Sequence, residues 1–100
     1  MTKGSIQDTL VERGARYGEF AEHARITQNI KVAMVDSPNW KSLSPAMKES
    51  LEMVAHKVGR ILNGDPSYID SWHDMVGYAQ LVEDILGKAE NEKESEHGKS

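Results

Sequence analysis

The sequence contains no cysteine, and this absence excludes several kinds of site. A chain without thiols has no disulfide framework, no thiolate zinc site, no iron–sulfur cluster and no cysteine nucleophile. Apolar runs are also short, since none approaches the roughly 20 residues that a bilayer-spanning helix needs. The segment Met1 to Ser5 lacks the apolar run of a signal peptide. We therefore expect a cytoplasmic protein with no membrane partner.

Aromatic residues make up only 6% of the 100 residues, while 38% are hydrophobic and 28% are charged. These proportions predict one soluble domain with a modest core, so self-association would help its stability. The 16 carboxylates outnumber the 12 lysines and arginines, which gives a net charge of −4. Proteins that bind duplex DNA use a surplus of cations to displace phosphate counterions, so we expect no nucleic-acid partner.

Helix signals divide the chain into four segments, and no segment alternates apolar and polar residues with the period of a strand. A short helix is predicted to begin at Ser5 and to weaken near Gly14 and Gly18, because glycine is unfavourable inside helices. The second helix is predicted from Glu19 to about Val35, before Pro38. The sequence therefore predicts an all-α protein, a small bundle of about four helices completed by homo-oligomerisation.

The third helix is predicted to begin at Ser44-Pro45, a capping side chain followed by a proline at the first helical position. The sequence Asn63-Gly64 is typical of its end. A fourth helix is expected from near Asp70 to Gly87, so that residues 1–87 form one domain. The charged residues 88–100 contain no large apolar side chain and are expected to be disordered.

Apolar residues recur in these segments at three- and four-residue steps, the spacing of one helical face. We expect these side chains to be buried. The positions are Phe20, Ala24, Thr27, Ile30 or Lys31, and Met34 in the second segment, Met47, Leu51, Val54, Val58 and Ile61 or Leu62 in the third, and Trp72, Met75 or Val76, Ala79, Val82 and Leu86 in the fourth.

A polar stripe runs beside the apolar one on the third segment. Its members are Glu49, Glu52, His56, Arg60 and Asn63, at steps of three or four residues. The fourth segment adds Asp70 and Asp74, also four residues apart. If the two helices pack antiparallel, the four carboxylates and His56 converge. Facing carboxylates bind Mg²⁺ or Mn²⁺, and Lys57 and Arg60 would then neutralise phosphate charge.

Each of these residues also has a purely structural interpretation. Charged stripes are commonly solvated helix surfaces, and Asp70 caps a helix equally well. His56 is either a metal ligand, a base or a hydrogen-bonded structural residue. His23 is either structural, at the edge of the core, or part of a base-recognition or metal site.

The segment before the second helix contains Arg13, Arg16 and Tyr17. These residues are suited to an anion-binding lid with an aromatic surface for a nucleobase, although single arginine and tyrosine residues near a turn are common.

The acidic spacing resembles that of a known superfamily. The pair Glu49-x-x-Glu52, followed by Asp70-x-x-x-Asp74, is similar to the acidic signature of the all-α nucleoside triphosphate pyrophosphohydrolases, the MazG-like and dimeric dUTPase superfamily. The chain resembles small uncharacterised proteins of tailed phages and prophages more closely still. That resemblance covers roughly residues 12–86 and rests on residues 52–66 (EMVAHKVGRILNGDP), residues 70–79 (DSWHDMVGYA), and Arg13-x-x-Arg16-Tyr17-Gly18 followed by His23.

The resemblance implies Mg²⁺-dependent cleavage of a nucleoside triphosphate into a monophosphate and pyrophosphate, by a homodimer or homotetramer in the cytoplasm of a bacterial host. Carried over by position, the residues that hold the metal would be Glu49, Glu52, Asp70 and Asp74. The catalytic set would then be Glu49, Glu52 and His56, and the expected nucleotide contacts are Lys57, Arg60, Asn63, Arg16 and His23. Lys48 stands where the superfamily usually has a glutamate adjacent to Glu49.

A second function remains open from the sequence. A helical module without catalysis would use its surface to bind a host or phage protein. Release of pyrophosphate that depends on a divalent metal distinguishes the enzyme from such a module.

Overall fold

The computed structural model describes residues 5–98, with side chains described through residue 93. This part of the chain is all-α and contains no strand, which confirms the predicted fold class. None of its helices is both long and apolar enough to cross a membrane. The elements are α1 (Ile6–Tyr17), α2 (Phe20–Val35), the short 3₁₀ helix η1 (Trp40–Ser42), α3 (Pro45–Asn63) and α4 (Ile69–Gly98).

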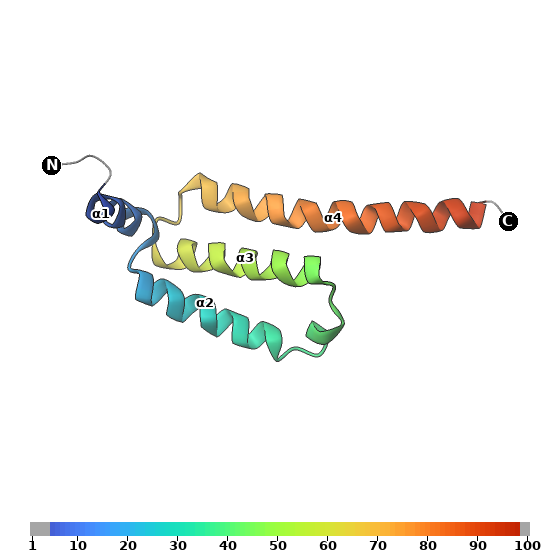
Figure 1. Ribbon diagram of the computed structural model, residues 1–100, viewed down its shortest axis with the longest axis horizontal. Coiled ribbons are helices and arrows are strands. Elements are labelled where there is room, and N and C mark those ends of the chain that lie inside the picture. The colour runs from blue at the N-terminus through green and yellow to red at the C-terminus, as the bar shows by residue number, and fades with distance from the viewer. Residues whose placement is uncertain (1–4, 99–100) are drawn as a thin grey trace.

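The helices α2, α3 and α4 lie side by side, with α3 in the middle (Figure 1). Each runs antiparallel to its neighbour, and α1 lies across the end where α2 begins and α3 ends. The far half of α4 extends beyond α3, so the molecule measures 70 × 31 × 23 Å. A single layer of this kind covers α3 on two sides and leaves its other faces open.

The predicted helix starts at Ser5 and Ser44 are confirmed. The hydroxyl of Ser5 accepts a hydrogen bond from the backbone N–H of Asp8, and that of Ser44 accepts one from Met47, both at 3.2 Å. Each cap satisfies a backbone donor that has no partner inside its helix. Pro45 occupies the first turn of α3, as expected from its missing N–H.

The prediction that α1 weakens at Gly14 is wrong, because α1 continues to Tyr17 and ends at Gly18. One glycine costs a helix only about 1 kcal/mol relative to alanine. An ion pair across the same turn, between Glu12 and Arg16 at 3.1 Å, supports the helix there.

The predicted end of the last helix at Gly87 is also wrong. Helix α4 passes through Gly87 and reaches Gly98, so residues 88–98 of the expected disordered tail are helical. Glutamate and lysine dominate that stretch, and both have high helix propensity. Residues 99 and 100 of the expected tail lie outside the described residues.

The apolar core is much smaller than the stripes predict. Among the described residues, Ala55 is the one buried hydrophobic side chain. Phe20, Trp72 and Val76 were expected in the core but are 80%, 50% and 64% exposed. The cause is the single-layer arrangement, which leaves one face of every amphipathic helix without a neighbour. The apolar stripes are real, but this chain alone does not cover them.

Polar side chains occupy much of the buried contact between α3 and α4. The hydroxyl of Ser50 donates to the carbonyl of Tyr78 at 2.8 Å. The ammonium of Lys57, which is 7% exposed, lies 3.0 Å from a carboxylate oxygen of Asp74. A buried charge is tolerated when it is paired, so this ion pair holds α4 in register with α3.

Helices α2 and α3 approach most closely at Gly59, beside the buried residues His23 and Thr27. A side chain at position 59 would collide with the Thr27 hydroxyl and would place its first carbon 3.0 Å from Nδ1 of His23. The Thr27 hydroxyl and Nδ1 of His23 are buried without a hydrogen-bond partner among the described residues. Glycine is therefore required at this helix crossing.

We expect Gly59→Ala to destabilise the protein by about 1–3 kcal/mol, because the added methyl group forces α2 away from α3. Chemical denaturation followed by circular dichroism measures this change. Gly77→Ala on α4 is the matched control, because a methyl group there meets no other atom. Equal stability of the two variants would contradict the proposed close crossing.

Candidate functional site

A pocket of about 410 Å³ opens where α1, α2 and α3 meet. Helix α3 contributes His56 and Arg60, α2 contributes Phe20 and His23, and the rest comes from α1 and the α1–α2 joint. The remaining lining residues are Leu10, Arg13, Gly14, Tyr17, Gly18 and Glu19. Its volume lies in the range of small-molecule sites.

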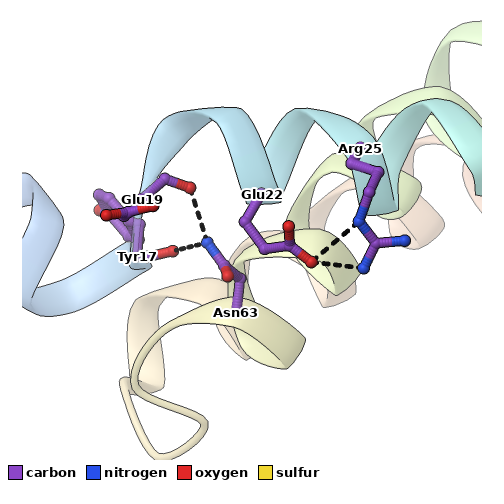
Figure 2. A network of polar contacts seen from close by, with 5 residues as sticks. All are labelled: Tyr17, Glu19, Glu22, Arg25 and Asn63. Carbon is purple, nitrogen blue, oxygen red and sulfur yellow. Dashed lines mark hydrogen bonds and ion pairs between the residues drawn. The ribbon is translucent and has the colours of Figure 1, made fainter.

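The joint between α1 and α2 is held by the end of α3. The side-chain amide of Asn63 donates to the carbonyls of Tyr17 and Glu19, both at 2.9 Å, as Figure 2 shows. Gly18, between them, has a φ of 78°, a conformation that favours glycine. The backbone N–H of Asp65 adds a 2.7 Å bond to the carbonyl of Arg16. These bonds set the angle at which α1 forms one wall of the pocket.

Two guanidinium groups border the pocket beside an aromatic ring. The guanidinium carbon of Arg60 lies 4.1 Å from the centre of the Tyr17 ring, and that of Arg13 lies 5.6 Å from it. These distances are those of cation–π contacts. Within the part of the chain that the structure describes, neither arginine forms an ion pair with a carboxylate. Positive charge is therefore available to a ligand in the pocket.

His23 and His56 form a contacting pair in the pocket wall. Nε2 of His23 lies 3.3 Å from Nδ1 of His56, and the two rings meet edge to face. One of these nitrogens donates and the other accepts, so the two rings must hold matched tautomers. Because this hydrogen bond contains one proton, the protonation state of one ring depends on that of the other.

Both histidines are held in the neutral form. Burial lowers the pKa of His56 to about 4, and the positive charges of Arg60, Lys57 and Lys31 act in the same direction. Burial also lowers the pKa of His23, and this effect outweighs an opposing contact with the backbone of Gly59. A general base works best with a pKa near the ambient pH. His56 is therefore a weak base at neutral pH and serves better as a hydrogen-bonding group.

The polar stripe of α3 faces α2 and the α1–α2 joint. Glu52 lies 3.7 Å from the ammonium of Lys31 on α2, and His56 and Arg60 line the pocket. Glu49 is exposed and forms no ion pair among the described residues. The predicted shared face therefore exists.

The acidic residues of α4 do not join that face within one chain. Asp74 pairs with Lys57, on the side of α3 that contacts α4, whereas Glu52 pairs across to α2. Asp70 accepts a 2.9 Å hydrogen bond from the Tyr68 hydroxyl. Among the residues that the structure describes, no group of three or more histidine, aspartate or glutamate side chains is arranged to hold a metal. Within one copy, Glu52 and Asp74 are therefore engaged by lysines toward different neighbours of α3, α2 and α4.

Three of the expected nucleotide contacts have structural partners instead of a place in the pocket. Lys57 is buried against Asp74, and the amide of Asn63 is engaged by two backbone carbonyls. Arg16 pairs with Glu12 and lies over the Tyr68 ring at 5.2 Å. Arg60 and His23 do line the pocket.

Neither a protein family model nor a curated protein nor a solved structure matches the chain.

Leu10 and Phe20 are pocket residues that the sequence did not indicate as such. Phe20 follows the same helical spacing as true core residues, and spacing does not reveal which faces a neighbour covers. The one available signal is its position two residues after Gly18, the joint that turns α1 back over α2.

We expect the free energy of unfolding to fall as the pH is lowered from 6.5 toward 4. In this range the unfolded chain protonates His56 at its ordinary pKa, whereas the folded chain keeps it neutral, so acid favours unfolding. The expected loss is about 1–2 kcal/mol after allowance for partial exposure. Denaturation at several pH values measures it.

The matched variants for this measurement are His56→Gln and His73→Gln. His56→Gln should reduce the pH dependence between 6.5 and 4 and leave the contribution of His23, whereas His73→Gln, which changes an exposed residue, should leave it unchanged. An equal pH dependence in the wild type and His56→Gln would show that His56 is not held neutral by the fold.

Proposed function

We propose that this protein binds a nucleoside triphosphate in the pocket between α1, α2 and α3. The observation that supports this most directly is that Arg13 and Arg60, which form no ion pair among the described residues, both lie close to the Tyr17 ring in a pocket of about 410 Å³. A planar aromatic surface next to clustered arginine charge suits a ligand that has both a base and phosphates.

The chemistry of the pocket walls indicates where each part of the ligand would lie. The phosphates lie against Arg13 and Arg60, because guanidinium groups bind phosphate oxygens through two parallel hydrogen bonds. The base lies against Phe20, whose exposed ring lines the pocket. The neutral histidine pair supplies hydrogen bonds without adding charge, so the binding energy for phosphate comes from the two arginines.

We propose hydrolysis of the bound triphosphate as the reaction, in which water displaces pyrophosphate and leaves a nucleoside monophosphate. This part of the proposal rests on the acidic spacing and its resemblance to the pyrophosphohydrolases. The stripe that contains Glu49 and Glu52 continues into the pocket at His56. Since the described residues of one copy do not assemble a metal site, no step of the reaction is assigned to the metal.

Self-association into a homodimer or homotetramer is part of the same proposal. Large apolar side chains remain exposed on every α-helix. The same exposure supports the second candidate, a non-enzymatic module whose apolar surface binds a host or phage protein.

We expect Arg13→Gln and Arg60→Gln to weaken triphosphate binding by about tenfold each, because each removes one charge-assisted contact to phosphate. Isothermal titration with the common nucleoside triphosphates measures the affinity. Arg25→Gln is the control, because Arg25 lies on α2 outside the pocket and pairs with Glu22. An equal loss in Arg25→Gln, or no binding of any triphosphate by the wild type, would refute the pocket assignment.

We expect the wild type to release pyrophosphate only when Mg²⁺ or Mn²⁺ is present, and we expect Glu49→Gln to slow release by at least about tenfold. A coupled phosphate assay after pyrophosphatase treatment measures the rate. Glu49 is preferred to Asp74 for this test, because Asp74 neutralises buried Lys57 and its loss would destabilise the fold. Glu90→Gln on α4 is the control. Binding without metal-dependent turnover would support nucleotide binding alone and remove the hydrolysis.

A further inference from the structure

Five exposed side chains form an apolar face on the α3–α4 pair. Two belong to α3 and three to α4, and they are between 45% and 73% exposed: Leu51, Leu62, Ile69, Trp72 and Val76. Leu51 and Leu62 are three helical turns apart on one line, and the other three follow steps of three and four residues. This apolar face therefore consists of two neighbouring stripes on packed antiparallel helices.

The solvent-accessible surface area of the molecule indicates that such a face is normally covered. The chain exposes 7689 Å². A compact folded protein of 11.2 kDa exposes about 5,700 Å², so the excess is about 2,000 Å². The radius of gyration of 18.4 Å likewise exceeds the roughly 13 Å of a compact domain of this length. The free half of α4 contributes to both differences, yet the apolar face lies where α4 is packed on α3.

This excess for one chain lies within the range of area that each subunit of an obligate homodimer buries, roughly 1,000–2,500 Å². Obligate homodimers bury 2,000 Å² or more in total, about 1,000 Å² per subunit, and their interfaces resemble a domain core cut in half. One buried hydrophobic residue, Ala55, is too little core for 100 residues. The rest of the core must come from another molecule. A second copy of this chain is a partner that is present wherever the first copy is made.

We propose that two copies pair through this apolar face, so that their α3–α4 hairpins form a four-helix bundle. This inference deepens the self-association within the proposed function by naming the surface. An antiparallel helix pair with one apolar side is half of such a bundle, and a two-fold axis brings the same stripes together from both copies. Trp72 is the central anchor, because its indole N–H donates to the carbonyl of Pro66 at 2.8 Å and fixes the ring.

The pairing leaves the pocket open. At 100° per residue, Leu51 and Leu62 lie about 120–140° around α3 from His56. On α4, Trp72 and Val76 lie about 160° from Asp74. The apolar face and the pocket therefore occupy different sides of α3, and each can be changed without the other.

The first test compares two valines of similar exposure by sedimentation equilibrium. Val76 on the apolar face is 64% exposed and Val32 on α2 is 67% exposed. We expect the wild type and Val32→Lys to dimerise equally well. Val76→Lys should dissociate at least about 100-fold more readily, because a lysine there would be buried without a partner.

A second measurement does not depend on a variant of the apolar face. In Trp40→Phe, Trp72 is the single tryptophan, and its ring is half-exposed in one copy. We expect its emission to shift to longer wavelength when the protein is diluted, while the helical circular dichroism signal is retained. This result would report exposure of Trp72 as the dimer separates.

Three results would overturn the pairing. They are a wild type that stays monomeric at every concentration, Val76→Lys that dimerises as well as Val32→Lys, and Trp72 emission that does not change on dilution. Triphosphate binding by folded Val76→Lys separates the two proposals. Retained binding with lost dimerisation supports both, whereas a dimeric wild type that binds no triphosphate supports the pairing and refutes the nucleotide function.

Discussion

The close contact of α2 with α3 at Gly59 is the constraint on which the arrangement depends. Only a residue without a side chain lets the buried ring of His23 and the hydroxyl of Thr27 lie against the backbone of α3. That contact buries His23 and brings it to within 3.3 Å of the half-buried His56. The pocket, the matched tautomers and the low pKa values of the histidines all follow from this approach of two helices.

The molecule separates its charge chemistry by the faces of α3. On the side toward α4, Lys57 and Asp74 neutralise one another and hold the helices in register. On the side toward α1 and α2, Arg13 and Arg60 lie on the Tyr17 ring without a carboxylate partner among the described residues. Paired charge maintains the fold, and the unpaired charge is available for an anionic ligand. This division is the physical basis of the proposed nucleotide site.

The third face of α3 is apolar and is continued by α4. In a single layer of helices this face has no neighbour, which explains why stripes with ideal core spacing contain residues as exposed as Val76. This uncovered face is the basis of the proposed pairing of two copies. Pocket and apolar face are then two consequences of one arrangement, in which α3 is flanked by α2 and α4 and has two further faces to use.

Local signals in the sequence determined the elements. The Ser5 and Ser44 caps, Pro45, and the Asn63-Gly64 ending act through bonds within a few residues, so the helix boundaries near them could be predicted. The polar stripe of α3 was also predictable, because helical periodicity alone puts its residues on one face. Glycine signals were less decisive, since α1 and α4 pass through Gly14 and Gly87.

The tertiary structure alone decided which stripe meets which neighbour. Asp74 faces Lys57 and not Glu52, Asn63 holds the α1–α2 joint, and Phe20 lines the pocket. The physical reason is that the angle between packed helices depends on contacts such as Gly59 against Thr27, which join residues far apart in the chain and leave no periodic trace in it.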